Sequence, residues 1–151
     1  MRRHWTMRLV FAGAAVAMLA GCELRPVLAS ATAERSGESE VIRVQIPSRD
    51  AKAIKRRQMN FYLIVSECAG HDGRSALDAT IGGARVAEFR YPTVGEVTTI
   101  EGVMPHREFD GYRNPCAMVE GGGYFTGTLR SDPVEIVRHA GNDMRVRTPA
   151  R

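Results

Sequence analysis

Beyond residue 40, apolar residues recur mainly at every second position, which is the period of a β-strand with one buried face. In the segment 41–47, Ile42, Val44 and Ile46 share one face. The run 59–68 is almost continuously apolar and rich in aromatic and β-branched residues, which indicates a central core strand. The pattern predicts further strands at 76–81, 84–90, 96–103, 116–120, 124–130 and 133–138.

Turn residues separate these predicted strands. Gly82-Gly83 and the run Gly121-Gly122-Gly123 are expected in hairpin turns, because glycine adopts positive φ without steric cost. Only the segment 48–57 suggests a short helix, with Ser48 as its candidate N-cap.

A series of about 7–8 short strands predicts an all-β fold, a small antiparallel β-sandwich of immunoglobulin-like architecture. A small barrel is the alternative arrangement. Two hallmarks of true immunoglobulin domains are missing. The single Trp is Trp5, outside the predicted strands, and Asn114 stands two residues before Cys116, where such domains carry a tyrosine. The expected likeness is therefore one of architecture, not of family.

The first 21 residues have the pattern of an export signal. An apolar run of eleven residues at 9–19 is preceded by three basic residues, Arg2, Arg3 and Arg8. As a helix this run would span about 16 Å, well short of a bilayer's hydrocarbon core. Its length is that of a signal-peptide core, so we expect residues 1–21 to be removed on export.

The positive charge of the chain belongs mainly to this leader. The formal net charge is +4, from 21 Lys and Arg residues and 17 Asp and Glu residues. Three of those basic residues and none of the acidic ones lie in 1–21, which leaves a net charge of +1 on the rest. The remaining chain lacks the basic excess typical of nucleic-acid binding, and we expect no nucleic-acid partner.

The leader ends in Leu19-Ala20-Gly21-Cys22, which resembles the lipobox of bacterial lipoproteins. The resemblance implies that a diacylglyceryl group is attached to the Cys22 thiol and that cleavage occurs before this cysteine. Acyl chains would then hold the protein on a membrane. The alternative is an ordinary secretory signal with a coincidental cysteine.

The same resemblance suggests a location, and the composition of the chain beyond Cys22 suggests a domain organisation. Glu23, rather than Asp, follows the cysteine, which favours the outer membrane and a protein that faces the periplasm. Residues 22–40 are small and polar and are expected to form a flexible tether. The β domain is predicted at 41–138, and 139–151 is expected to be a basic C-terminal tail.

The two remaining cysteines, Cys68 and Cys116, are expected to form a disulfide, because an exported protein folds in an oxidising compartment. The alternative is a pair of buried free thiols. A catalytic cysteine is not supported, since His71 is the only candidate partner near Cys68 in the sequence.

Two segments contain candidate binding residues. In 105–115, Phe109 and Tyr112 are interspersed with Arg107 and Arg113, a composition typical of binding loops. A turn with its aromatic side chains folded onto the domain fits this composition equally well. Four cations in the predicted helix suggest contact with lipid head groups, although a solvated surface is the simpler interpretation; they are Lys52, Lys55, Arg56 and Arg57.

The histidines give only a weak indication of catalysis. His71 lies beside Asp72, and His106 precedes Glu108 and Asp110, but no metal-ligand spacing is present, and we predict no metal and no cofactor. The sequence therefore favours a lipid-anchored binding or structural module of a cell-envelope assembly, with an envelope protein as partner. The alternative is a small envelope hydrolase that uses a loop histidine with a neighbouring carboxylate.

Overall fold

The structure of the protein is a computed structural model, which describes residues 23–70, 73–123 and 127–139. The predicted signal peptide (1–21), the predicted lipidation residue Cys22, His71 and residues 140–151 of the predicted tail lie outside the described residues.

Ten strands and three short helices occur in the described residues. The helices are α2 (Ser48–Arg56), the 3-10 helix η1 (Val86–Glu88) and α3 (His106–Phe109). The strands are β1 (Ser30–Ser36), β2 (Ser39–Pro47), β3 (Asn60–Glu67), β4 (Ser75–Asp78), β5 (Thr80–Ile81), β6 (Ala84–Arg85), β7 (Val97–Pro105), β8 (Pro115–Gly123), β9 (Gly127–Arg130) and β10 (Val134–His139).

All ten strands belong to one sheet, with the order β4-β3-β8-β10-β1-β2-β7-β5-β6, and β9 pairs with β8 beside this path. β1 and β10 run parallel, whereas the other pairs are antiparallel. β10 bridges two neighbours: Val134 and Glu135 pair with β8, and the following residues pair with β1.

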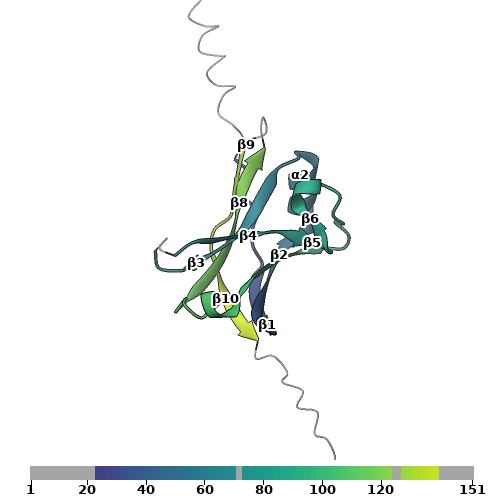
Figure 1. The fold of residues 1–151 in the computed structure, drawn as a ribbon. Helices are drawn as coiled ribbons and strands as arrows, with labels where there is room; N and C mark the ends of the chain where they lie inside the picture. The colour runs from purple at the N-terminus through teal and green to yellow at the C-terminus, as the bar shows by residue number, and fades with distance from the viewer. Residues whose placement is uncertain (1–22, 71–72, 124–126, 140–151) are drawn as a thin grey trace, which may run out of the picture.

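The sheet curls until it is nearly closed (Figure 1). β4 pairs with β3 and β5 pairs with β7, yet only Ala79 separates β4 from β5 in the chain. One short segment thus connects strands that are far apart in the sheet order. The predicted all-β fold is confirmed, but the two-layer immunoglobulin-like sandwich is not.

The core lies inside this curl and follows the predicted alternation. Ile42, Val44 and Ile46 of β2 are completely buried, and Phe61 and Leu63 of β3 join them in the main cluster. Burial of such apolar side chains is the dominant favourable term in folding. The strands predicted at 41–47 and 59–68 are therefore confirmed as core strands.

The predicted tether at 22–40 is wrong for most of its length. Residues 30–36 form β1, which pairs with β2 over seven residues, and Leu28, Ala31 and Ala33 are buried in the core. Further towards the N-terminus, Leu24 forms a bridge with Leu129. Because alanine carries little apolar surface, the alternation of β1 gives a weak sequence signal. The folded domain begins well before Val41.

The predicted helix at 48–57 is confirmed as α2, but Ser48 is not its cap. Pro47 occupies the N-cap position and makes no capping hydrogen bond through its side chain, while Ser48 is the first helical residue. The Ser48 hydroxyl is buried 2.8 Å from the Thr98 hydroxyl of β7. Ala51 and Ile54 face the core, which fixes α2 against the sheet.

Two predictions about turns and strands need correction. In the predicted strand 84–90 only Ala84 and Arg85 are extended, and η1 follows. The glycines at 121–123 belong to β8 rather than to a turn, and Gly121 pairs with Phe61 of β3. By contrast, Gly82 and Gly83 do form the predicted turn between β5 and β6, both with positive φ.

Candidate functional site

The β2–β7 ribbon has two distinct ends. Because β2 and β7 are antiparallel, Ser39 pairs with Pro105 at one end and Pro47 pairs with Val97 at the other. α2 follows β2 directly and α3 follows β7 directly, so the two helices lie at opposite ends of the ribbon. We call these the α2 end and the α3 end. The short turn between β1 and β2 also lies at the α3 end.

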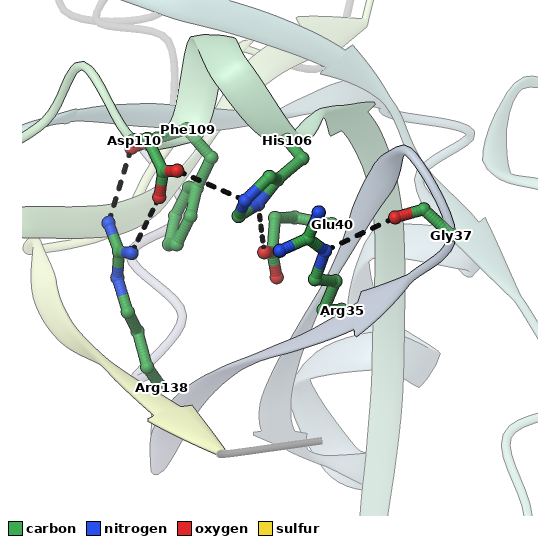
Figure 2. A network of polar contacts seen from close by, with 7 residues as sticks. All are labelled: Arg35, Gly37, Glu40, His106, Phe109, Asp110 and Arg138. Carbon is green, nitrogen blue, oxygen red and sulfur yellow. Dashed lines mark hydrogen bonds and ion pairs between the residues drawn. The ribbon is translucent and has the colours of Figure 1, made fainter. Parts of the chain in front are cut away.

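A network of charged side chains is built at the α3 end (Figure 2). His106 lies between two carboxylates: its Nδ1 is 2.6 Å from Glu40 Oε1, and its Nε2 is 3.0 Å from Asp110 Oδ2. Arg138 of β10 extends the chain, because its Nη1 donates to Asp110 Oδ1 at 2.8 Å. Three separate segments of the sequence therefore meet around α3, at His106 and Asp110.

Local structure positions these groups. α3 is a single turn, so His106 and Asp110 lie four residues apart on the same face. The backbone N–H of His106 donates to the Glu38 carbonyl at 2.8 Å, which ties α3 to the turn before β2. Phe109, beside them on α3, is fully buried, and the Arg138 guanidinium stacks over its ring at 4.5 Å (Figure 2).

The charged groups of this network differ in how far they are shielded from water. The Glu40 side chain is only 7% exposed and that of His106 20% exposed, so their contact is largely shielded from water. Carboxylates accept hydrogen bonds, so the two contacts are both satisfied when both ring nitrogens of His106 carry a proton. The pKa of Asp110 lies below its ordinary value, chiefly because Arg138 donates to it, and the charge of His106 acts in the same direction.

A cleft of about 540 Å³ adjoins this network. His106 and Pro105 form part of its wall, while Arg35 and Arg107 bring two cations to it. Arg35 is held in place by a hydrogen bond from its Nε to the Gly37 carbonyl at 3.2 Å. Glu38 and Ser39 complete the lining. The cleft is thus polar, with charges of both signs.

A second cleft, of about 480 Å³, lies between α3 and the start of β4. The Tyr112 hydroxyl donates to the Gly73 carbonyl and lies 2.8 Å from the Ser75 hydroxyl, which in turn donates to Glu108. Glu67 lies at the edge of this cleft and accepts hydrogen bonds from the backbone N–H groups of Arg113 and Asn114. These two bonds, the one from Arg113 having the larger effect, lower the pKa of the Glu67 carboxyl.

The predicted binding loop is only partly exposed. Phe109 and Tyr112 are buried in the core, which agrees with the alternative that the aromatics fold onto the domain. Arg107 and Arg113 are exposed, and Arg107 lines the cleft beside His106. A binding surface here would therefore be made of charged groups rather than of aromatic anchors.

The sequence suggested only part of the network. His106 was paired with Glu108 or Asp110, and the structure selects Asp110. Glu40 and Arg138 were not identified. A signal for Glu40 existed, since the β2 alternation places this carboxylate on the same face as the buried Ile42 and Val44.

The predicted disulfide between Cys68 and Cys116 is present, with the two Cα atoms 5.0 Å apart. It lies at the α3 end, where the last residues of β3 pair with the start of β8. The remaining histidine, His139, is exposed at the end of β10. Across residues 23–70, 73–123 and 127–139, no group of three or more His, Cys, Asp or Glu side chains is arranged to hold a metal ion.

Comparison with known proteins does not assign a family: the sequence matches no protein-family model, and no curated protein is significantly similar to it. Within the described ranges, every helix is too short or too polar to traverse a lipid bilayer.

Acid should weaken the contribution of Asp110 to stability. Its folded pKa lies below that of the unfolded chain, so the stabilisation is complete above the unfolded value of about 3.9 and is lost as the pH falls through the folded value. We expect the free energy of unfolding of Asp110→Asn to fall less between about pH 5 and pH 2 than that of the wild type. Denaturant titrations across this range measure the difference.

Arg138→Gln provides the matched control for this prediction. Because Arg138 is the main cause of the lowered pKa of Asp110, this variant should flatten the pH dependence in the same way. The double variant should add little to either single change. Fully additive effects would show that Asp110 and Arg138 act independently.

Proposed function

We propose that this protein is a lipid-anchored lipoprotein of the bacterial cell envelope, whose β domain is a binding or structural accessory module of an envelope assembly. The lipobox Leu19-Ala20-Gly21-Cys22 supports the anchor. The Cys68–Cys116 disulfide is consistent with an oxidising compartment such as the periplasm. An outer-membrane location facing the periplasm remains part of this proposal.

The position of Leu24 carries the proposal. Its N–H donates to the Thr128 carbonyl at 2.9 Å, and its carbonyl accepts from the Arg130 N–H at 3.1 Å. Leu24 is thereby attached to β9 only two residues after Cys22, so its Cα lies within about 7 Å of that of the anchor residue. Acyl chains on Cys22 would hold the domain close to the membrane instead of on a long tether.

This attachment defines which end is free to meet a partner. β9 pairs with the last residues of β8, which pair with the first residues of β3, next to α2. Leu24 therefore lies near the α2 end, so a lipid on Cys22 would be attached on that side of the domain, and the α3 end would be farther from the membrane. In Figure 1, β9 and α2 lie towards the top, and β1 ends at the bottom. The cleft beside His106 and the exposed Arg35 and Arg107 would then be presented to an envelope protein.

Cys22→Ser should abolish acylation and release the protein from the membrane fraction. Each methylene of an acyl chain that is buried in the bilayer contributes about 0.8 kcal/mol to membrane binding, and the variant loses this contribution for the whole chain. No helix in the described residues can span the membrane in its place. Labelling with radioactive palmitate and fractionation of cells that produce the full precursor measure both effects.

The matched control is Cys68→Ser/Cys116→Ser, which removes the other two cysteines and their disulfide but leaves the lipobox intact. This variant should still incorporate palmitate and remain with the membranes. Undiminished incorporation of palmitate into Cys22→Ser would contradict the proposal, because the acylated residue would then lie elsewhere.

The hydrolase alternative has one observation in its favour: His106 contacts a buried carboxylate beside a cleft that Ser39 also lines. However, both ring nitrogens of His106 are engaged, by Glu40 and by Asp110. A general base needs one nitrogen within reach of the proton that it removes. The arrangement fits a structural ion network better than a catalytic one.

A further inference from the structure

The outward face of α2 is strongly basic. The segment 48–57 contains five Lys and Arg residues and a single acidic residue, Asp50. Arg49, Lys52 and Arg56 are spaced by three and four residues, so they lie on one side of the helix, and all three are exposed. Of these, Arg49 has an ion-pair contact with Asp50 at 3.7 Å.

The opposite face of α2 is fixed to the domain. Ala51 and Ile54 are buried in the core, and Lys55 donates to the Tyr91 carbonyl at 2.7 Å while lying over the Tyr91 ring. With its apolar side already covered, α2 has no apolar surface to insert into a bilayer. Its exposed side is suited to electrostatic contact with head groups instead.

Three exposed valines lie close to α2 in the structure or in the chain. Val27 is 64% exposed, and its N–H donates to Asp50 of α2 at 3.3 Å. Val97, 47% exposed, is the first residue of β7 and pairs with Pro47, the residue before the helix. Val94, 83% exposed, lies three residues earlier in the chain. Half of the six large hydrophobic residues exposed in the described structure thus gather at the α2 end.

The first described residues are close to the same surface. Leu24 is hydrogen-bonded to β9, and Val27, three residues later, contacts α2 itself. β9 and α2 both lie towards the top of Figure 1, whereas β1 and β10 end at the bottom. Cations, exposed valines and the start of the described chain therefore share one end of the molecule.

We propose that the α2 end lies directly on an anionic phospholipid surface, with Arg49, Lys52 and Arg56 at the level of the head groups. This inference rests on the proposed lipid anchor at Cys22, which brings the surface within reach. Anionic lipids attract cations held at the membrane, and the attraction decays within a Debye length of about 8 Å at physiological salt. The domain would thereby acquire a fixed orientation, with the His106 cleft facing away from the membrane.

The two lysines of the chain, Lys52 and Lys55, make a sensitive test possible. Acylated full-length protein is reconstituted into vesicles of phosphatidylglycerol and phosphatidylethanolamine, or of phosphatidylcholine alone. An uncharged amine-reactive reagent is then applied. We expect Lys52 to be labelled several-fold more slowly on the anionic vesicles, and high salt to remove the difference. Lys55, already covered by Tyr91, is the internal reference.

Charge variants separate lipid contact from general crowding. Arg49→Gln/Arg56→Gln keeps the Lys52 reporter but should weaken the contact by about fivefold per cation, which restores labelling on anionic vesicles. The matched control, Arg107→Gln/Arg113→Gln, removes two exposed cations at the α3 end and should leave Lys52 protected. Circular dichroism confirms that each variant is folded.

Flotation of the same samples distinguishes the two ways in which the idea can fail. If the protein floats with the vesicles but Lys52 is labelled equally on both compositions, the anchor stands and the contact of α2 with lipid is refuted. If the protein does not float, the lipid anchor itself fails, and this orientation fails with it.

Discussion

Removal of the Cys68–Cys116 disulfide is expected to lower the free energy of unfolding by about 4 kcal/mol. The two cysteines are 48 residues apart, so the bond removes a large loop-closure entropy from the unfolded chain. A domain of this size is commonly stable by about 5–15 kcal/mol, so the loss is a large share of the total. Denaturant unfolding of Cys68→Ala/Cys116→Ala, in a Cys22→Ser background, measures it.

Reductant supplies the control for this prediction. The parent protein should lose similar stability when its disulfide is reduced, whereas the double variant should not respond to reductant. Cys116 is buried, so truncation to alanine adds a small packing loss that reduction does not cause. Two freely titratable thiols in the folded, non-reduced parent would contradict the prediction.

The strands that sequence patterns identified are those with a strong period. Ile42, Val44 and Ile46 alternate with polar residues, and β2 was predicted within two residues at its start. The sequence pattern does not predict β1, because its inward residues are Ala31 and Ala33, which are small. Its partners β2 and β10 supply most of the buried surface. A strand of small residues becomes evident only through its neighbours.

The curled sheet could not be read from local pattern for a related reason. β4 and β5 pair with different partners, β3 and β7, and this change of partner happens across Ala79 alone. Within the sequence 76–81 nothing marks the change, because the apolar alternation runs through it without a break. Periodicity specifies a strand and its buried face, but not its neighbours.

The candidate site shows the same limit. His106 and Asp110 are local partners on one helical turn, and sequence reasoning placed them among its alternatives. Glu40 is 66 residues from His106 and joins it only through the pairing of β2 with β7. For Phe109 the sequence leaves a binding role and a core role open, because large aromatics are enriched both in cores and in binding surfaces. Only the structure distinguishes these two roles, because it places the Phe109 side chain in the core.

Gly121→Ala should cost about 3 kcal/mol of stability, through overpacking between two central strands. A Cβ at this position would lie 2.0 Å from the Asn60 carbonyl oxygen and 2.6 Å from the Phe61 Cα. Both are backbone atoms of β3, which cannot rotate away as a side chain would. Relief therefore requires β3 and β8 to separate, which disturbs the pairing beside the buried Phe61. Denaturant unfolding measures the loss.

Gly37→Ala is the matched control, because it adds the same methyl group at a glycine with no atom within 4 Å of the new Cβ. Its φ of +62° is costly for alanine, so a loss of about 1 kcal/mol is expected from backbone strain alone. The additional loss of unfolding free energy in Gly121→Ala, compared with Gly37→Ala, then measures the cost of the contact with β3. Equal losses at the two glycines would mean that β3 and β8 yield easily at this point, and the close approach would not explain why glycine occupies position 121.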